Sequence, residues 1–492
     1  MIDGRAFRTA GVIGAGTMGS GIAIVLARAG VRTLLFDLDS ATLHRARDRA
    51  ERFLQRSVEL GKLTGVAFAN AMSDLVLCTR LDELEPCDLI IEAVFESRAT
   101  KKALLEQLHS VCRPETILAT NTSTLSVTEL ASASGRADRV VGLHFCLPAE
   151  RMRLVEVTPA LNTSAATLQA AVDFCESVGQ QPVVTQDRPG FILNALAIPL
   201  NNSAIRLVEA GVAQPASIDT ALKHAFGHAM GPLELLDLVG LDTQILLSEA
   251  LHASTNDARA FCPPLLRRMT SAGWLGGKSG GGFYTHFPET LPEPTAAPVL
   301  FIPRAGSDSV DATRALRVPS TETSDARAVV LQELGPEGLA VHTDGVGHPL
   351  GGPVIGFAPY DAGCGSPPRV VELVVSTDTP TTALAAALGV AQSLGLIAVV
   401  CRDRPGRILD RLIRPYLNDA LRCVDEQLAT AADIDFTVRM GLGFREGPIE
   451  LGERSGLVHH FHTSRRLHEA LGEPAFVPAR RARMAYEVNG PG

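Results

Sequence analysis

Apolar and polar positions alternate over residues 1–160 in blocks that predict buried strands separated by helices. Five short apolar runs occur in this stretch, at residues 11–13, 33–36, 89–91, 117–119 and 140–143. Such runs are typical of parallel strands that are covered on both faces. Sequences with helical spacing lie between them, including 20–28 and 100–111. This order predicts an α/β fold with a doubly wound parallel sheet.

The pattern changes after residue 187, where helical spacing dominates up to about residue 270. Glycine-rich residues 276–284 interrupt the helices, and the Pro/Thr/Ala-rich stretch 287–298 predicts a linker. Strand-like runs return at 299–302 and 370–375. The second half of the chain therefore begins a new α/β unit of its own.

An internal repeat explains this return. When the chain is laid over itself at an offset of 216, the DRPG sequence at 187–190 falls on the DRPG sequence at 403–406. Without a gap, Ile218-Asp219 then meets Ile434-Asp435, and Gly231-Pro232 meets Gly447-Pro448. Val155-Glu156-Val157 also meets Val371-Glu372-Leu373. The helical region is therefore duplicated, and the second copy begins upstream of residue 400.

These observations predict four domains. An N-terminal Rossmann domain occupies residues 1–186, and an all-helical domain follows at 187–290. A linker with a small degenerate α/β domain spans 291–400, and the second helical domain spans 401–492.

The composition narrows the function classes. The 492 residues are 46% hydrophobic and 20% charged, with 45 basic and 54 acidic residues and a net charge of −9. This balance disfavours binding to nucleic acid or to an anionic membrane surface. The nine cysteines form no CxxC pair and no cluster with histidine, so we expect neither disulfides nor a metal site. With no apolar signal or membrane-spanning segment, the sequence predicts a cytoplasmic protein.

A glycine-rich turn with the spacing GxGxxG joins the first predicted strand to the first helix, and it reads Gly14-Ala15-Gly16-Thr17-Met18-Gly19. Gly14 permits the tight turn, Gly16 lets a pyrophosphate approach the backbone, and Gly19 allows close packing of helix and strand. The second strand ends at Asp37, where a carboxylate binds ribose hydroxyls and repels a 2′-phosphate. The sequence therefore predicts NAD as the cofactor.

His144 and Glu156 are candidates for acid–base chemistry. His144 follows an apolar run at the carboxyl edge of the predicted sheet, where such sheets bind ligands. Glu156 lies inside another apolar run, so its carboxylate needs a partner, and an imidazole is one. The alternative is a structural histidine and a glutamate paired with an arginine.

Taken together, these motifs resemble the NAD-dependent L-3-hydroxyacyl-CoA dehydrogenases, which include bacterial 3-hydroxybutyryl-CoA dehydrogenases. From Gly11 to Tyr284 the family's motifs occur in order, namely the glycine turn, IEAVFE at 91–96, NTS at 121–123, the stretch 144–156, PGFILN at 189–194, MGPLELLD at 230–237 and a closing glycine-rich Phe-Tyr segment. The chain length and the second helical copy resemble the long bacterial forms. Some of those oxidise 3-hydroxyadipyl-CoA in phenylacetate breakdown.

The resemblance implies a role for each motif. His144 is the general base that takes the proton of the substrate's 3-hydroxyl, and Glu156 orients it. Ser123 and Asn194 hydrogen-bond around the reacting oxygen and the thioester. The cofactor-binding residues implied in this way are Gly14, Gly16, Thr17, Met18, Gly19, Asp37, Glu96 and Lys101.

The chain departs from the family pattern at two positions. Leu147 stands where the family usually has Asn, and Ala195 where it usually has Arg. In the second copy, the offset of 216 places Tyr360 opposite His144, whereas a slip of two residues places Ala358 there. Neither residue is a base. Gly351-Gly352 lacks a following helical pattern and predicts a loop rather than a second cofactor turn.

We therefore predict NAD-dependent oxidation of an L-3-hydroxyacyl-CoA of the 3-hydroxybutyryl or 3-hydroxyadipyl type. The alternatives are a dehydrogenase of a free hydroxy acid and a non-catalytic binding or structural relative. The helical domains of the short family members dimerise, so the resemblance implies that the two copies here pair within one chain. Further homo-oligomerisation stays open.

Overall fold

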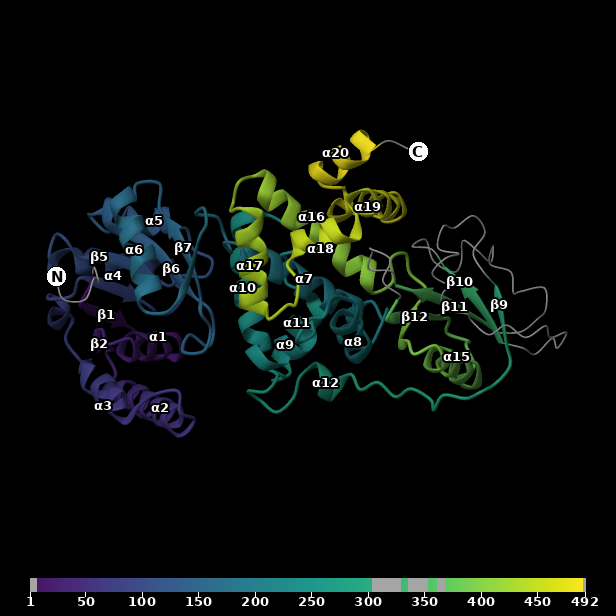
Figure 1. Cartoon of the computed structure of the whole chain (residues 1–492), viewed down its shortest axis with the longest axis horizontal. Coiled ribbons are helices and arrows are strands. Elements are labelled where there is room, and N and C mark those ends of the chain that lie inside the picture. The colour runs from purple at the N-terminus through teal and green to yellow at the C-terminus, as the bar shows by residue number, and fades with distance from the viewer. Residues whose placement is uncertain (1–6, 303–328, 335–352, 361–367, 490–492) are drawn as a thin grey trace. The chain divides into compact units, whose positions relative to one another are not determined.

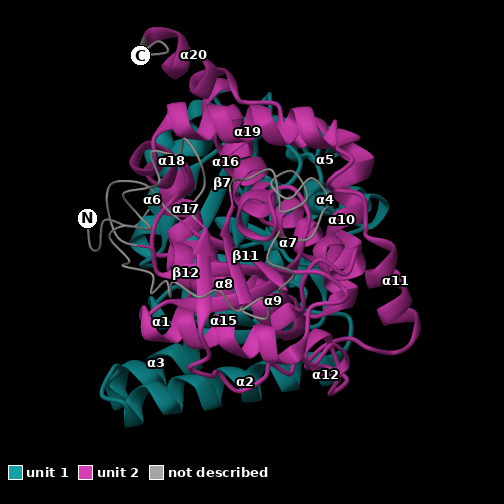
Figure 2. Ribbon diagram, turned by 90° about the vertical axis from the view of Figure 1, so that its right-hand side faces the viewer, with its two compact units in different colours: residues 1–195, 427–433 teal, residues 196–426, 434–492 magenta. Residues whose placement is uncertain are grey.

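The structure is a computed structural model and describes residues 7–302, 329–334, 353–360 and 368–489. The loop expected at Gly351-Gly352 lies outside these described residues. The chain divides into two compact units, and Figure 2 colours them teal and magenta. Unit 1 comprises residues 1–195 and 427–433, and unit 2 comprises residues 196–426 and 434–492.

Unit 1 is built around one sheet (Figure 1). Its strands are β1 (Thr9–Ile13), β2 (Arg32–Phe36), β3 (Leu75–Cys78), β4 (Leu89–Glu92), β5 (Ile117–Thr120), β6 (Val140–Phe145), β7 (Leu154–Pro159) and β8 (Gln181–Val184). Its helices are α1 (Thr17–Arg28), α2 (Ser40–Glu59), α3 (Gly65–Asp74), α4 (Arg98–Val111), α5 (Val127–Ala131) and α6 (Ala165–Ser177), with the short 3-10 helices η1 (Leu81–Leu84) and η2 (Ala137–Arg139).

The strand order in this sheet is β3-β2-β1-β4-β5-β6-β7-β8. Strand residues that are neighbours in sequence face opposite sides, so Leu35 and Ile91 pack under α1, α2, α3 and α6, whereas Leu34 and Ile90 pack under α4 and α5. Helices on both faces confirm the predicted doubly wound architecture. The sheet is parallel throughout except between β6 and β7, which are antiparallel. The sequence pattern did not predict this reversal.

The helices of unit 2 form two sets. The first set is α7 (Leu193–Glu209, whose first three residues belong to unit 1), α8 (Pro215–Phe226), α9 (Pro232–Val239), α10 (Leu241–Thr255), α11 (Pro264–Ser271) and α12 (Phe283–His286). The second set is α16 (Leu409–Asp425), α17 (Ala431–Leu442, whose first three residues belong to unit 1), α18 (Pro448–Ser455), α19 (Leu457–Leu471), η3 (Pro474–Phe476) and α20 (Arg480–Asn489). The helices α16, α18 and α19 begin at the repeat counterparts of the first residues of α7, α9 and α10, as the sequence predicts.

A second, smaller sheet lies between the two sets in sequence. Its strands are β9 (Val299–Ile302), β10 (Val329–Glu333), β11 (Val354–Pro359), β12 (Val370–Val375) and β13 (Ile397–Arg402), and helix α15 (Thr381–Ser393) packs on it. The strand order is β13-β12-β11-β10-β9, with only β11 and β12 antiparallel.

This second sheet resembles the half of the first sheet that contains β6, β7 and β8. At the repeat offset, the bounds of β12 and α15 coincide with those of β7 and α6, and β11 lies two positions short of the counterpart of β6. The antiparallel step falls at the equivalent pair of strands in both sheets. Within the described part of the second copy, nothing corresponds to β1, β2, β3 or the glycine turn. As far as the structure describes it, the degenerate α/β unit predicted from the sequence is therefore a half sheet, and no cofactor turn is found in these residues.

Candidate active site

The glycine turn lies between β1 and α1. Gly14 has φ +96°, a conformation that favours glycine, and a Cβ there would lie 2.7 Å from the Ala93 oxygen. A Cβ on Gly19 would lie 1.7 Å from the Gly14 oxygen, so this glycine is needed for the close approach of α1 to β1. Gly16 caps α1 and has open space around its Cα. Its exposed neighbour Thr17 borders the same space. A dinucleotide pyrophosphate fits such a helix N-terminus without steric conflict.

Asp37 follows β2 and faces the glycine turn. The Ala15 amide donates to Oδ2 of Asp37 at 2.8 Å, and the Asp39 amide donates to Oδ1 at 3.0 Å. The carboxylate therefore fixes the turn, and it is half-buried at the carboxyl end of the strand. The next side chain, Leu38, is 89% exposed and provides no cation for a 2′-phosphate. This arrangement fits NAD.

The antiparallel pairing of β6 and β7 brings His144 opposite Glu156. His144 Nδ1 lies 2.7 Å from Glu156 Oε2, and His144 Nε2 lies 3.1 Å from Ser123 Oγ. His144 is 6% exposed and Glu156 is fully buried. A carboxylate only accepts hydrogen bonds, so it holds the ring hydrogen on Nδ1 and leaves the lone pair on Nε2.

The remaining oxygen of Glu156 fixes the next segment of the chain. Oε1 accepts from the amides of Ile192 and Leu193 at 2.8 and 3.0 Å. These bonds place Asn194 beside the site, where its amide nitrogen lies 3.5 Å from the Ser123 carbonyl oxygen. The structure thus brings together His144, Glu156, Ser123 and Asn194, from positions up to 71 residues apart.

Glu96 and Lys101 form part of a buried network next to Ser123. Lys101 is fully buried, and its Nζ lies 2.7 Å from Glu92 Oε1 and 3.2 Å from Glu96 Oε2. Glu96 Oε1 accepts from the Ser123 amide at 2.7 Å and from the Thr122 hydroxyl at 2.5 Å. Burial raises the pKa of Glu96, but Lys101 and these hydrogen bonds outweigh it, so its pKa lies below the ordinary value. Lys101 therefore pairs with Glu96 inside the fold, and its own side chain is not exposed to a ligand.

Glu92 is a site residue that the sequence analysis did not single out. It is fully buried at the end of β4, and it accepts from Lys101, from the Thr120 hydroxyl and from the Val94 amide. Its position directly after the apolar run 89–91 could have indicated a buried carboxylate, and a buried charge requires a partner.

The two departures from the family pattern, at Leu147 and Ala195, differ in setting. Ala195 is half-buried in α7, directly after Asn194. Leu147 is 48% exposed and has no polar side chain to offer the site. The neighbouring Cys146 is buried, and burial followed by the charge of Glu156 raises the pKa of its thiol far above the ordinary value. Cys146 is therefore a thiol packed in the core and a weak nucleophile.

The equivalent place in the second copy holds different side chains. Glu372 accepts from the amides of Ile408 and Leu409 at 2.9 and 3.0 Å, as Glu156 does from Ile192 and Leu193. Opposite Glu372 on β11 stands Ala358, so the register with the two-residue slip is the structural one. The free oxygen of Glu372 accepts from Arg407 at 2.8 Å.

The side-chain amide of Asn194 also has a different counterpart in the second copy. Asp410 stands at the place of Asn194 and pairs with Arg414 at 2.9 Å, and both side chains are buried. The second copy thus carries ion pairs where the first copy has a base and an amide.

Over the described residues, no helix is long and apolar enough to cross a membrane. Nor do three or more potential metal ligands cluster anywhere in the described ranges.

Comparison with known proteins agrees with the site. The family model for the 3-hydroxyacyl-CoA dehydrogenase NAD binding domain matches residues 9–188. The model for the C-terminal domain of the same family matches 190–286 and 406–492, which are the two helical copies.

Individual relatives cover either the whole chain or its first part. The 3-hydroxyadipyl-CoA dehydrogenase of Escherichia coli is 34% identical over 96% of both chains. A crystal structure of 3-hydroxybutyryl-CoA dehydrogenase from Escherichia coli superposes with a TM-score of 0.82 and 32% identity over 98% of both chains. A 3-hydroxybutyryl-CoA dehydrogenase of Mycobacterium tuberculosis is 42% identical over 57% of this chain and 99% of its own length. The chain belongs to the 3-hydroxyacyl-CoA dehydrogenase family and is an NAD-dependent oxidoreductase.

Proposed function

We propose that the chain oxidises an L-3-hydroxyacyl-CoA to the 3-ketoacyl-CoA at a single active site in its N-terminal half. One observation carries this proposal, namely the continuous hydrogen-bonded line from Ser123 Oγ through His144 to Glu156. Such a line keeps one imidazole nitrogen basic while the other is fixed by a carboxylate.

In this proposal His144 Nε2 accepts the proton of the substrate's 3-hydroxyl. The ring becomes an imidazolium, and the fully buried Glu156 stabilises that charge at 2.7 Å. Ser123 Oγ, 3.1 Å from Nε2, contacts the same hydroxyl, and the Asn194 amide donates to the thioester carbonyl. NAD bound at the glycine turn supplies the acceptor for the hydride from the same carbon.

The cofactor-binding residues in this proposal are Gly14, Gly16, Thr17, Met18, Gly19, Asp37 and Glu96, with Lys101 holding Glu96. Replacing Asp37 by Ser together with Leu38 by Arg removes the repulsion of a 2′-phosphate and adds a cation for it. We expect the cofactor preference to shift toward NADP in this variant. Steady-state rates with NAD and NADP measure the shift, and a wild-type protein that already uses both cofactors would contradict the role of Asp37.

The substrate is a 3-hydroxyacyl-CoA of the 3-hydroxybutyryl or 3-hydroxyadipyl type. The support is that one full-length relative is named for 3-hydroxyadipyl-CoA, whereas another full-length structure and a shorter relative are named for 3-hydroxybutyryl-CoA. NADH formation with each thioester and with free 3-hydroxybutyrate tests this. Turnover of the free acid at the rate of the thioesters would favour a hydroxy acid dehydrogenase, and no turnover of any of them would favour a binding protein.

The division into domains at 1–186, 187–290, 291–400 and 401–492 is also part of this proposal, as is a location in the cytoplasm. Nine cysteines without paired spacing favour a reducing compartment.

We further propose that the two helical copies pair within the chain as two subunits would. The support is local symmetry inside unit 2, where His228 forms a β-bridge to Phe444 and their rings stack at 3.5 Å. These two residues are counterparts at the offset of 216, so the same position of each copy meets its own equivalent. Removing everything after Pro298 should expose the apolar contact surface and produce a dimer or an aggregate. Sedimentation of the truncated chain tests this, and a well-behaved monomer would contradict it.

A further inference from the structure

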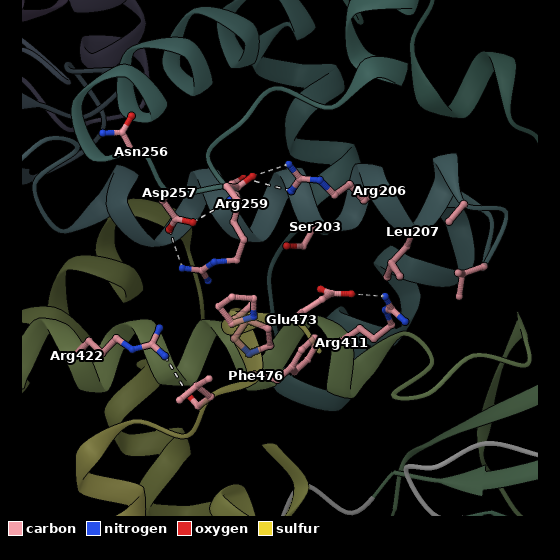
Figure 3. A pocket seen from close by; sticks show the side chains of 17 residues that line it. Ser203, Arg206, Leu207, Asn256, Asp257, Arg259, Arg411, Arg422, Glu473 and Phe476 are labelled. Atoms are coloured by element: carbon pink, nitrogen blue, oxygen red, sulfur yellow. Dashed lines mark hydrogen bonds and ion pairs between the residues drawn. The ribbon is translucent and has the colours of Figure 1, made fainter. Parts of the chain in front are cut away.

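Unit 2 contains a cavity of about 890 Å³ that is lined by none of the residues of the proposed active site. Helices α7 and α16 and the segments 256–259 and 473–477 line it, and Figure 3 shows its side chains. Leu207, Val212, Phe476 and Val477 give it apolar walls. A volume of this size suits a small organic ligand.

Four arginines line the cavity, two from each helical copy, and three of them are neutralised by carboxylates. These pairs are Arg259 with Asp257 and Asp419, Arg411 with Glu473, and Arg422 with Asp419. The distances between guanidinium and carboxylate atoms are all 3.4 Å or less.

Arg206 is the exception. Over the described residues, its guanidinium donates to the backbone oxygens of Ala258, Arg259 and Phe261, at 3.2, 3.3 and 2.7 Å, and to no carboxylate. Three acceptors leave two of its five N–H groups without a hydrogen bond. Burial lowers the pKa of Arg206 and outweighs the opposing effect of Glu209, Glu473 and Asp257, which act on the guanidinium without contacting it. An arginine nevertheless keeps its charge at neutral pH. A positive charge that no carboxylate contacts therefore stands at the wall of the cavity.

The repeat shows which group is missing. Arg206 and Arg422 are counterparts at the offset of 216, and they donate to equivalent loop carbonyls. Arg206 donates to the carbonyl of Phe261, and Arg422 donates to that of Val477. Arg422 also pairs with Asp419, three residues before it. The counterpart of Asp419 is Ser203, which lines the cavity beside Arg206 (Figure 3). At this position the first copy therefore has a small side chain, which borders the cavity, where the second copy has a carboxylate.

We propose that this cavity binds an organic carboxylate with an apolar body, such as a medium-chain fatty acid. The carboxylate pairs with Arg206 in place of the acid that the second copy carries at Asp419, and the apolar body packs on Leu207 and Phe476. The anionic group is argued from Arg206, the one arginine of the described lining that no carboxylate contacts, and the apolar body from the apolar walls.

Titration of the full-length protein with octanoate in a calorimeter tests this proposal. We expect saturable binding of one octanoate per cavity, and no comparable binding of the neutral octanol. Arg206→Gln should weaken octanoate binding about tenfold or more, the usual effect of losing a charge-assisted hydrogen bond. Arg422→Gln is the matched control, because Arg422 already has Asp419, and it should change the affinity much less. His144→Gln should bind octanoate as the wild type does, which separates this site from the active site.

A second variant tests the proposal independently, in case Arg206→Gln does not fold. Ser203→Asp gives the first copy the ion pair that Asp419 and Arg422 form in the second, at the same spacing on an equivalent helix. We expect this variant to fold with undiminished stability toward urea and to lose octanoate binding. The proposal is overturned if wild type binds no octanoate at millimolar concentration, if Ser203→Asp binds it as wild type does, or if Arg206→Gln and Arg422→Gln weaken binding equally.

Discussion

Glu156 in the first copy and Glu372 in the second are the same carboxylate in two different settings. Each is buried on the strand that runs antiparallel to its neighbour, and each accepts two amides from the start of a helix. The remaining oxygen meets His144 in the first copy and Arg407 in the second. One partner is an imidazole, which can both accept and donate a proton, whereas the other is a guanidinium that keeps its charge.

The backbone around the two carboxylates has hardly changed. Arg407 has φ +47°, and its counterpart Phe191 has φ +49°, so both copies keep the same unusual conformation before the helix. The carboxylate and its two amide bonds thus serve the fold, because they join a strand to a helix. In the proposed function, catalysis additionally depends on His144, and cofactor binding depends on the strands β1 and β2, which among the described residues only the first sheet supplies.

Removing the base should separate the two copies most clearly. In His144→Ala we expect kcat to fall by about 10²–10⁴, the usual contribution of general acid–base catalysis. NAD affinity should stay near the wild-type value, because the glycine turn and Asp37 are unchanged. Initial rates and NAD calorimetry measure both quantities. Tyr360→Phe in the second copy is the control and should leave kcat within about twofold. A large loss of kcat in Tyr360→Phe, or wild-type kcat in His144→Ala, would contradict the assignment of chemistry to the first copy.

Neutralising the second carboxylate should affect stability instead. Glu372→Gln removes the carboxylate that pairs with the buried Arg407, and breaking a buried pair in this way costs about 3–5 kcal/mol. Urea unfolding measures the loss, and kcat per folded molecule should not change. Adding Arg407→Phe, the residue type found at position 191, should recover much of the lost stability. If the double variant is no more stable than Glu372→Gln, the cost does not come from the lost pair between Glu372 and Arg407.

The same substitution in the first copy should act on rate. Glu156→Gln keeps an acceptor for the amides of Ile192 and Leu193, but it removes the charge that fixes and stabilises the His144 ring. We expect kcat to fall roughly 10–100-fold, as for other supporting carboxylates of histidine. Initial rates at saturating substrate measure the loss. Wild-type kcat in Glu156→Gln would indicate that Glu156 has the same structural role as Glu372.

Local motifs predicted much of the fold and of the site. The spacing GxGxxG, the closing Asp37 and the offset of 216 each depend on residues near one another or on an exact repeat, and the structure contains all three features. The sequence left the counterpart of His144 in the second copy open between Tyr360 and Ala358. The reason is that the chain between β11 and β12 is two residues longer than the chain between β6 and β7. The length of a connection with no motif of its own cannot be inferred from a repeat.

Contacts between distant segments were harder to predict. Lys101 matches a family position near the cofactor, yet the structure buries it under Glu92 and Glu96, which come from the strand β4 and the segment after it. The pairing of Arg407 with Glu372 could not be predicted either, since no sequence pattern shows which buried cation contacts Glu372. Burial of a charge is decided by packing of the complete fold, which single-sequence periodicity does not record.

The smallest expected difference concerns two aspartates that cap equivalent helices. Asp219 accepts from the amides of Leu233 and Glu234 at the start of α9, and Asp435 makes the same bonds at the start of α18. Burial raises the pKa of each carboxyl from 3.8 to about 6. A folded-state pKa above the unfolded value means that the folded state binds more protons between about pH 4 and pH 6. The stability from both groups is therefore complete below about pH 4 and decreases as the pH rises through 6.

One hydroxyl distinguishes the two caps, and removing it should reveal that pH dependence. Tyr284 donates to Asp219 at 2.8 Å, and this bond favours the ionised carboxyl. In Tyr284→Phe the pKa of Asp219 should rise further, so the variant should lose about 1 kcal/mol above pH 6 and much less near pH 4. Urea unfolding at both pH values measures the difference. Tyr416→Phe is the control, because the buried Tyr416 hydroxyl has no hydrogen-bond partner among the described residues, and its effect should not grow with pH. A loss in Tyr284→Phe that is equal at both pH values would mean that the phenol stabilises the fold by packing, and that Asp219 and Asp435 are alike after all.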